Sequence, residues 1–441
     1  MAIPQAFRVW SFGWLLLGFA LFYALVMGLM ALAGVVLARR TQGTRALELL
    51  DGQPDALIAE GQVVRTRHES GLARLYATGL FGGLILFYLA IPFIIAGLLV
   101  GTGLLLYLIF QMPRIPLKLV AVVVVEGLGG AWAVFKSLFA APGKGSFGLA
   151  KAPADCPRLY EALNEVARRV DTDPVHEIYL APGSAIGVHQ EGRGPFGVFG
   201  VKRRVLTLGL STMHFLTVDE LKSILAHEYA HFSHKDTFYN RFIYQVSLSI
   251  QQALEGMGQS GGNLNYVNPF YWFLVLYYKS YHLLSAGFSR SREFLADRMA
   301  SSLYGSDVFA SALTKVSTDG SLFEMTIYDN IAQLLTEGKA FINMYSAFRS
   351  FRDEQLPLQE REELYKKLLD EKASLFASHP TFGERIEAVK DLPRADKQDP
   401  TPALQLFESP EEVEKELTEF LTGYIHYVQQ MQAQAAAAAR Q

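Results

Sequence analysis

The segment His227-Glu228-Tyr229-Ala230-His231 contains residues whose types and spacing fit a hydrolytic metal site. Residues four positions apart lie on one face of an α-helix, so His227 and His231 can bind one Zn²⁺ together. The metal would lower the pKa of a bound water molecule, and Glu228 could take its proton and deliver it to a leaving amine. The pattern predicts hydrolysis of peptide bonds. In the alternative interpretation, the two histidines lie on the surface of a solvated helix and have no metal.

A third ligand is needed, because a catalytic zinc site uses three protein ligands and keeps one position open for water. Glu293 is the candidate, and Asp297 follows it by one helical turn. Asp297 could then hydrogen-bond the far nitrogen of a ligating histidine and fix its tautomer. On the pattern alone, a solvated acidic helix face accounts for these two carboxylates equally well.

A capped helix and short strands are predicted to position the motif. Thr217 and Glu220 match a capping box, with a hydroxyl at the N-cap and a carboxylate three residues later, and they open a helix that contains the motif. Ahead of this helix the sequence predicts strands at 177–180, 185–188 and 205–208, with a possible edge strand at 196–201.

The first 140 residues contain the long apolar runs. The run 14–37 has no charge and exceeds the roughly 20 residues that cross a bilayer. The run 76–110 is too long for one untilted crossing, and Pro92 favours a kink or a hairpin. A third run, 117–139, contains Glu126 and is either a crossing or an interfacial helix. We predict three or four transmembrane helices.

Charge and cysteine usage indicate the compartment. The loop between the first two runs is rich in arginine, whereas the N-terminal tail has only Arg8, so the positive-inside rule puts the loop in the cytoplasm. The single cysteine, Cys156, fits a reducing compartment, and we expect the soluble part there too. A net charge of −3 without a long basic run argues against nucleic-acid binding.

These observations divide the chain into four parts. We predict a transmembrane anchor at 1–140, a linker at 141–154, a zinc metallopeptidase domain at 155–395 and a C-terminal helix with a low-complexity tail at 396–441. An apolar helical hairpin at 240–288 interrupts the domain, and its pattern fits a core hairpin and a membrane-dipping one about equally.

The motifs together resemble the HtpX-like membrane gluzincins, whose relatives include the CAAX prenyl endopeptidases. HEYAH on a capped helix, a long apolar insertion, EFLAD and SHPTFGERI at 378–386 carry the resemblance over about residues 155–390. It implies that His227, His231 and Glu293 hold one zinc ion, that Glu228 is the general base and that Asp297 supports a ligand.

The resemblance also implies that His379 and Arg385 lie near the site, where they would donate to the oxyanion or orient a carboxylate. In the alternative reading, Arg385 pairs only with a helix-face carboxylate and His379 only begins a helix. The family usually has an asparagine before the motif helix, where this chain has residues 183–186, Gly-Ser-Ala-Ile. That departure puts the corresponding substrate contact in doubt.

We therefore predict a mainly helical α+β gluzincin domain on a multi-pass transmembrane region, in the bacterial inner membrane. Its expected partners are the bilayer and unfolded or membrane-derived polypeptides, as in protein quality control. One alternative is a prenyl-peptide endopeptidase, although the crossings are too few for a multi-helix barrel. Another is a membrane-anchored binding or chaperone module with structural zinc, against which Glu228 favours an open catalytic site. The sequence does not predict the oligomeric state.

Overall fold

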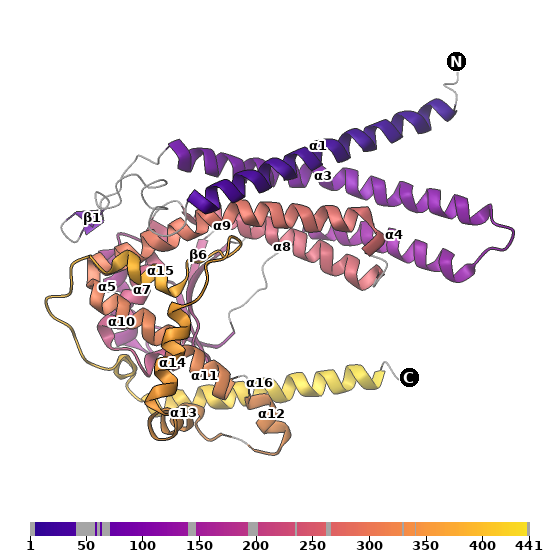
Figure 1. The fold of residues 1–441 in the computed structure, drawn as a ribbon. Helices are drawn as coiled ribbons and strands as arrows, with labels where there is room; N and C mark the ends of the chain where they lie inside the picture. Colours follow the sequence, from indigo (N-terminus) through magenta and orange to yellow (C-terminus); the bar gives the residue numbers. More distant parts are fainter. Residues whose placement is uncertain are drawn as a thin grey trace.

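The chain is mostly helical, with a small sheet in the part that follows the first helices (Figure 1). The structure is a computed structural model that describes residues 5–40, 58–59, 62–63, 71–139, 147–192, 202–233, 236–261, 266–328, 330–339 and 341–438. Within these ranges an elongated helical bundle adjoins a part that contains the main sheet (Figure 1).

Three helices of the described chain are long and apolar enough to cross a membrane. They are α1 (Gln5–Arg40), α3 (Gly71–Phe110) and α4 (Leu117–Ser137). Helix α3 continues through Pro92 instead of turning back as a hairpin, so of the three or four predicted crossings the described residues supply three. Proline is tolerated inside such a helix because neighbouring groups can satisfy the freed backbone carbonyl.

Two further helices, α8 (Asp236–Gly261) and α9 (Pro269–Tyr304), pack against these three in a separate apolar core (Figure 1). The contact is close at Gly97 of α3, where an added Cβ would lie 2.2 Å from the ring of Phe270. Helices α8 and α9 therefore lie beside the membrane helices. However, α9 does not end near residue 288. It continues to Tyr304 as one helix.

The main sheet has four strands in the order β3-β4-β6-β5. The strands are β3 (Leu149–Lys151), β4 (Glu177–Ala181), β5 (Ile186–Gly192) and β6 (Lys202–Gly209). Strand β4 pairs with β6 in parallel, and β5 pairs with β6 antiparallel and forms an edge. Three strands agree with the sequence pattern. Strand β3 lies inside the segment predicted as a linker because three residues are too few for a periodic signal, and the possible strand at 196–201 lies outside the described residues.

The remaining helices alternate with the strands or follow them. Helix α5 (Pro157–Arg169) lies between β3 and β4 in the chain, and α6 (Leu210–Met213) and α7 (Val218–Ser233) follow β6. Those after α9 are α10 (Ser306–Lys315), α11 (Ser321–Phe323), α12 (Ile331–Thr336), α13 (Met344–Ser350), α14 (Leu358–Leu369), α15 (Phe382–Val389) and α16 (Pro410–Ala438). Single turns of π-helix occur at Val316–Gly320, Glu324–Tyr328 and Phe351–Gln355, and one 3₁₀ turn at Ala403–Leu406. A small hairpin pairs β1 (Ile58–Ala59) with β2 (Gln62–Val63).

The capping box predicted for the motif helix is present at the start of α7. The Thr217 amide donates to Glu220 Oε2 (2.8 Å), and the Glu220 amide donates to Thr217 Oγ1 (3.3 Å). Lys315 Nζ of α10 donates to Glu220 Oε1 (2.7 Å), which ties the helix start to its neighbour. Leu221 and Leu225 are fully buried, so α7 is fixed by its cap and by its apolar face.

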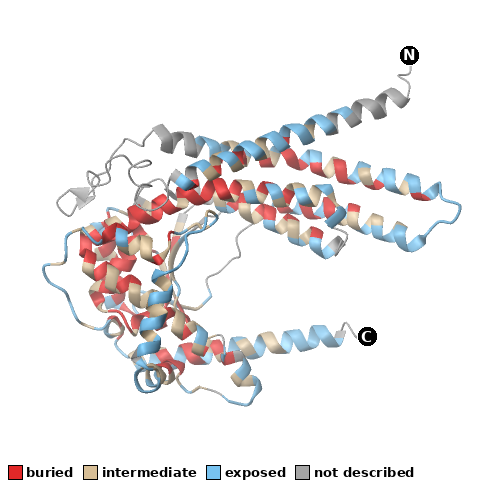
Figure 2. Cartoon of the chain, in the orientation of Figure 1, coloured by how far each residue is buried: buried red, intermediate tan, exposed pale blue. Residues whose placement is uncertain are grey.

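Buried residues occur along α9 from the bundle into the part that contains the main sheet (Figure 2). Tyr277 and Tyr281 belong to the core of the bundle, whereas Ala296 and Met299 belong to the core around the sheet. The middle of α9 therefore lies where the two cores adjoin, and so does the segment that contains Glu293.

Candidate metal centre

Helices α7 and α9 bring together the two histidines of the motif and Glu293. One ligand atom from each of His227, His231 and Glu293 lies within 4.8 Å of the others. Glu293 Oε2 is 3.5 Å from His227 Nε2, and Glu293 Oε1 is 3.5 Å from His231 Nε2. The imidazole rings stand at 90° to each other with centroids 5.0 Å apart. The two Nε2 atoms thus face one carboxylate.

This donor set fits a zinc ion. Two imidazole nitrogens and one carboxylate oxygen are a known ligand set for catalytic zinc. The side chains of His227 and Glu293 are nearly buried, with 7% and 10% exposed, and such buried polar groups need partners. His231 is 19% exposed, so one side of the group remains open. The role of these residues as ligands remains a prediction.

Asp297 and Arg385 support the group from behind. Asp297 has no exposed side-chain surface, and its Oδ1 lies 2.9 Å from His227 Nδ1. Arg385, from α15, donates to both Asp297 oxygens, from Nε at 2.9 Å and from Nη2 at 2.6 Å. Because Asp297 accepts the proton of Nδ1, it holds His227 in the tautomer that leaves Nε2 directed at Glu293. Of the alternatives for Arg385, the geometry favours orienting this carboxylate.

His379 approaches from the loop before α15. Its Nδ1 lies 3.2 Å from Glu293 Oε2, although 67% of its side chain is exposed. The following residues are fixed by a second capping box, in which the Glu384 amide donates to Thr381 Oγ1 (3.2 Å) and the Thr381 amide donates to Glu384 Oε2 (2.9 Å). His379 therefore presents an exposed polar edge beside the proposed metal ligands.

Glu228 lies on the sheet side of α7, next to the edge strand β5. The Val188 amide donates to Glu228 Oε2 at 3.4 Å, so this amide points away from β6. Alternate residues of a strand direct their backbone groups to the same side, so Ile186 and Gln190 share this orientation. Burial raises the pKa of Glu228 above its ordinary value, which suits a group that must both take up and release a proton.

The two histidines differ in charge state in the metal-free protein. Burial disfavours the charged form of His227, but hydrogen bonds to Asp297 and Glu293 outweigh burial and raise its pKa to about 10. Burial lowers the pKa of His231 to about 4. Burial also opposes ionisation of Glu293, yet hydrogen bonds from His227 and His379 keep its pKa well below the ordinary value. At neutral pH, His227 is thus charged and His231 is neutral.

We expect zinc uptake by the metal-free protein at pH 7 to release about one proton per ion, because a metal ligand must be deprotonated and only His227 carries an extra proton. The apparent zinc affinity should rise about tenfold per pH unit and level off near the pKa of His227, about 10. Calorimetry in buffers of different ionisation enthalpy measures the proton count. Uptake with no proton released at pH 7 would contradict this charge assignment.

Three features of the site were not predicted from the sequence. Arg290, three residues before Glu293 on α9, contacts the loop that carries His379. Glu324 Oε1 accepts from both the amide (2.6 Å) and the hydroxyl (2.7 Å) of Ser184, ahead of β5. The third is the Val188 amide. Of these three features, only the position of Arg290 is indicated by the sequence, because its spacing of three residues places it on the same helix face as Glu293.

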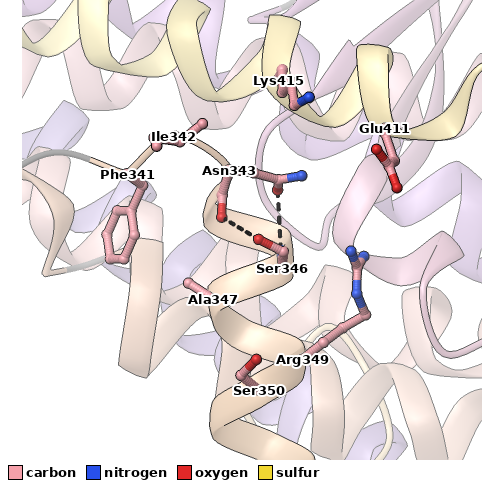
Figure 3. Close-up of a pocket in the computed structure, with 9 residues that line it drawn as sticks. All are labelled: Phe341, Ile342, Asn343, Ser346, Ala347, Arg349, Ser350, Glu411 and Lys415. Carbon is pink, nitrogen blue, oxygen red and sulfur yellow. Dashed lines mark hydrogen bonds between the residues drawn. The ribbon is translucent and has the colours of Figure 1, made fainter.

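A surface hollow of about 590 Å³ lies between α13 and α16, apart from the metal centre (Figure 3). Phe341, Ile342, Asn343, Ser346, Ala347, Arg349, Ser350, Glu411 and Lys415 line it. Two of its polar side chains already have partners, because Asn343 Oδ1 caps α13 and Arg349 Nη1 donates to Glu414 Oε1 (2.7 Å). None of the proposed metal ligands lines this hollow.

The comparison with known proteins agrees with this geometry. Residues 196–392 match the model of peptidase family M48, a range that contains every site residue predicted from the sequence. The chain is 28% identical over 180 residues to a "Protease HtpX homolog" of Acaryochloris marina, and the alignment covers 38% of this chain and 58% of that relative. The chain thus spans less than two thirds of that relative's length.

The alignments with two other relatives cover a larger share of each relative's length. A "Protease HtpX homolog" of Syntrophobacter fumaroxidans is 25% identical over 255 residues, which is 54% of this chain and 77% of the relative. "Protease HtpX" of Legionella pneumophila strain Lens is 28% identical over 247 residues, which is 53% of this chain and 76% of the relative. No solved structure matches the chain. The resemblance stated from the motifs is confirmed.

Proposed function

We propose that this chain is a membrane metalloprotease of peptidase family M48, similar to HtpX, and that it hydrolyses peptide bonds at a zinc ion held by His227, His231 and Glu293. The observation that carries the proposal is the convergence of these three ligand atoms within 4.8 Å, on helices that also present Glu228. Three protein ligands leave one position for the reacting groups, as in catalytic rather than structural zinc sites.

Each neighbouring side chain has a role in the proposed reaction. A bound zinc ion would supply Lewis acidity to the scissile carbonyl and to the attacking water. Glu228 removes a proton from that water and delivers it to the leaving nitrogen, a transfer that its raised pKa assists. His379 donates a hydrogen bond toward the negative charge that develops on the substrate oxygen. Asp297 and Arg385 hold the His227 ring in place.

The substrate binds as an extended chain along β5. Strand β5 is an edge of the sheet in the described part of the chain, and the outward backbone groups of Ile186 and Val188 lie at this edge, beside Glu228. A substrate that adds a strand there gains main-chain hydrogen bonds without requiring a particular side chain. This mode of binding favours unfolded polypeptides of varied sequence and hence protein quality control.

The site lies close to the bilayer. Tyr281 is buried in the bundle, and Glu293 follows it by twelve residues on the same helix, about 18 Å along the axis. This closeness supports membrane-derived polypeptides as substrates. With three crossings and the arginine-rich loop inside, the peptidase part lies in the cytoplasm of a bacterium, at the inner membrane.

Cleavage of unfolded casein by the detergent-purified full chain tests this proposal. We expect cleavage at many sites, loss of cleavage after chelation and recovery when zinc is returned, because the reaction needs the metal. Binding of casein without cleavage by the zinc-loaded protein would favour the binding or chaperone module instead. Mass spectrometry of the products separates the remaining alternatives, since one fixed site would contradict broad quality control and selective cleavage of prenylated peptides would indicate a prenyl-peptide endopeptidase.

A further inference from the structure

Arg290 of α9 is a buried arginine directed at an irregular loop. Only 5% of the residue is exposed. Its Nη1 donates to the carbonyl oxygens of Ala377 (2.8 Å), Ser374 (3.4 Å) and Leu375 (3.4 Å). A buried guanidinium needs several acceptors to replace the water it has lost, and these carbonyl groups contribute to that replacement.

The carbonyl groups belong to one turn of the loop. The Ala377 amide donates to the Ser374 carbonyl (3.2 Å), which closes the turn 374–377 between α14 and α15. His379 follows this turn by two residues and precedes α15. Because the turn is held on α9, the position of the turn determines the position of the His379 backbone.

The far end of the loop is held on the same helix. Arg385, in α15, forms its two hydrogen bonds with Asp297 of α9. Arg290, Glu293 and Asp297 are spaced three and four residues apart, so they lie along one face of α9. The loop is thus attached to this face one turn before Glu293 and one turn after it, and His379 lies between the two attachments.

His379 itself has little else to hold it. Two thirds of its side chain is exposed, and its polar contact is with Glu293 at 3.2 Å. We propose that Arg290 is a positioning residue, which fixes the turn 374–377 on α9 and thereby keeps His379 beside Glu293. This inference rests on the proposed function, in which His379 donates to the substrate oxygen.

Substitutions at Arg290 test the proposal in the full chain, reconstituted in lipid nanodiscs. We expect Arg290→Met to lower kcat for casein about 10- to 100-fold with little change in KM, because His379 is displaced by a fraction of an ångström or more. Arg290→Lys should fall between Met and wild type, since an ammonium keeps the charge but not the planar fork. The matched control is Arg169→Met. Arg169 donates to the Leu303 carbonyl (2.8 Å) at the C-terminal end of α9, away from His379. Removing this arginine should change kcat by less than about twofold.

A double variant separates positioning from general stability. If Arg290 acts through His379, Arg290→Met combined with His379→Asn is no slower than His379→Asn alone. Independent, additive losses would overturn the proposal. So would an unchanged kcat in Arg290→Met with full zinc content. Should Arg290→Met not fold, the same comparison with Arg290→Lys decides the question.

Hydrogen exchange supplies a readout that needs no activity. Amides of residues 374–381 should exchange faster in Arg290→Met and Arg290→Lys than in wild type, while those of α7 keep their rates. If wild type cleaves nothing, the proposed function fails, and this experiment still tests whether Arg290 holds the turn. Unchanged exchange at 374–381 in both variants would overturn the proposal even if the protein is a peptidase.

Discussion

Replacing Glu228 with glutamine should lower kcat for peptide hydrolysis by about 10²- to 10⁴-fold, the range that general acid–base groups contribute. The amide oxygen of glutamine can still accept the hydrogen bond from the Val188 amide, so the local structure should persist. Glutamine cannot take a proton from water or return it to the leaving nitrogen. Initial rates on a fluorogenic peptide, normalised to the zinc content of each preparation, measure the effect.

The matched control is Glu165→Gln, which alters a surface glutamate that pairs with Lys222 (2.6 Å) away from the metal centre. It should cleave like wild type. A Glu228→Gln protein with full zinc and a rate within tenfold of wild type would mean that another group is the base. A variant that loses both zinc and activity would assign Glu228 a role in building the site instead.

Replacing Arg385 with methionine should destabilise the protein by about 3–5 kcal/mol, the cost of removing one partner from a buried ion pair. Asp297 is fully buried, and Arg385 donates a charged hydrogen bond to each of its two oxygens. Without Arg385, a buried carboxylate keeps only the contact with His227. Zinc affinity should also fall, by about 10- to 100-fold, because the ring of His227 loses its support. Unfolding by denaturant in detergent and zinc titration measure the two effects.

The exposed ion pair Lys339–Glu337 (2.8 Å) provides the contrast. Lys339→Met should leave the stability close to that of wild type, because solvent screens that pair. Adding Asp297→Asn to Arg385→Met should recover part of the loss, since it removes the unpaired charge. An Arg385→Met protein within 1 kcal/mol of wild type would show that Asp297 does not need this partner.

The pH dependence of this pair follows from the carboxyl group. Burial opposes ionisation of Asp297, but Arg385 and His227 hold its pKa below the ordinary value. A carboxyl with a lowered pKa in the folded state contributes its full stability above the unfolded value of about 4 and loses it as the pH falls further. We therefore expect wild type to lose this contribution to its stability below about pH 4, and the pH profile of Arg385→Met to lack that loss because Asp297 has no charged arginine partner there.

The parts of the fold that local patterns encode could be predicted from the sequence. The capping box at Thr217 and Glu220 uses residues three apart, and the metal motif uses residues four apart, so one helical turn contains the whole signal. The long apolar runs likewise predicted the helices that could cross a membrane, because length and apolar composition together are a local signal.

The sequence patterns did not predict contacts between segments that are distant in the chain. Arg385 meets Asp297 across 88 positions, and only the family resemblance put the two near each other. The spacing of Arg290 from Glu293 indicates the helix face but not its partner, because the turn 374–377 offers backbone carbonyl groups, which are the same in every sequence. Pro92 favoured a break in α3, and tertiary packing kept the helix continuous.

The continuity of α9 has a mechanical consequence. Helix α9 is continuous, and it begins among the membrane helices and ends beyond Glu293. A change in its tilt relative to the bilayer therefore moves Glu293 in the proposed metal centre. Over the roughly 18 Å between Tyr281 and Glu293, a tilt of about 3° displaces the carboxylate by about 1 Å. A displacement of that size can cost about a hundredfold in rate. We therefore expect bilayer thickness, which sets the inclination of embedded helices, to change the rate of the proposed hydrolysis. Turnover measured in lipids of graded chain length tests this expectation.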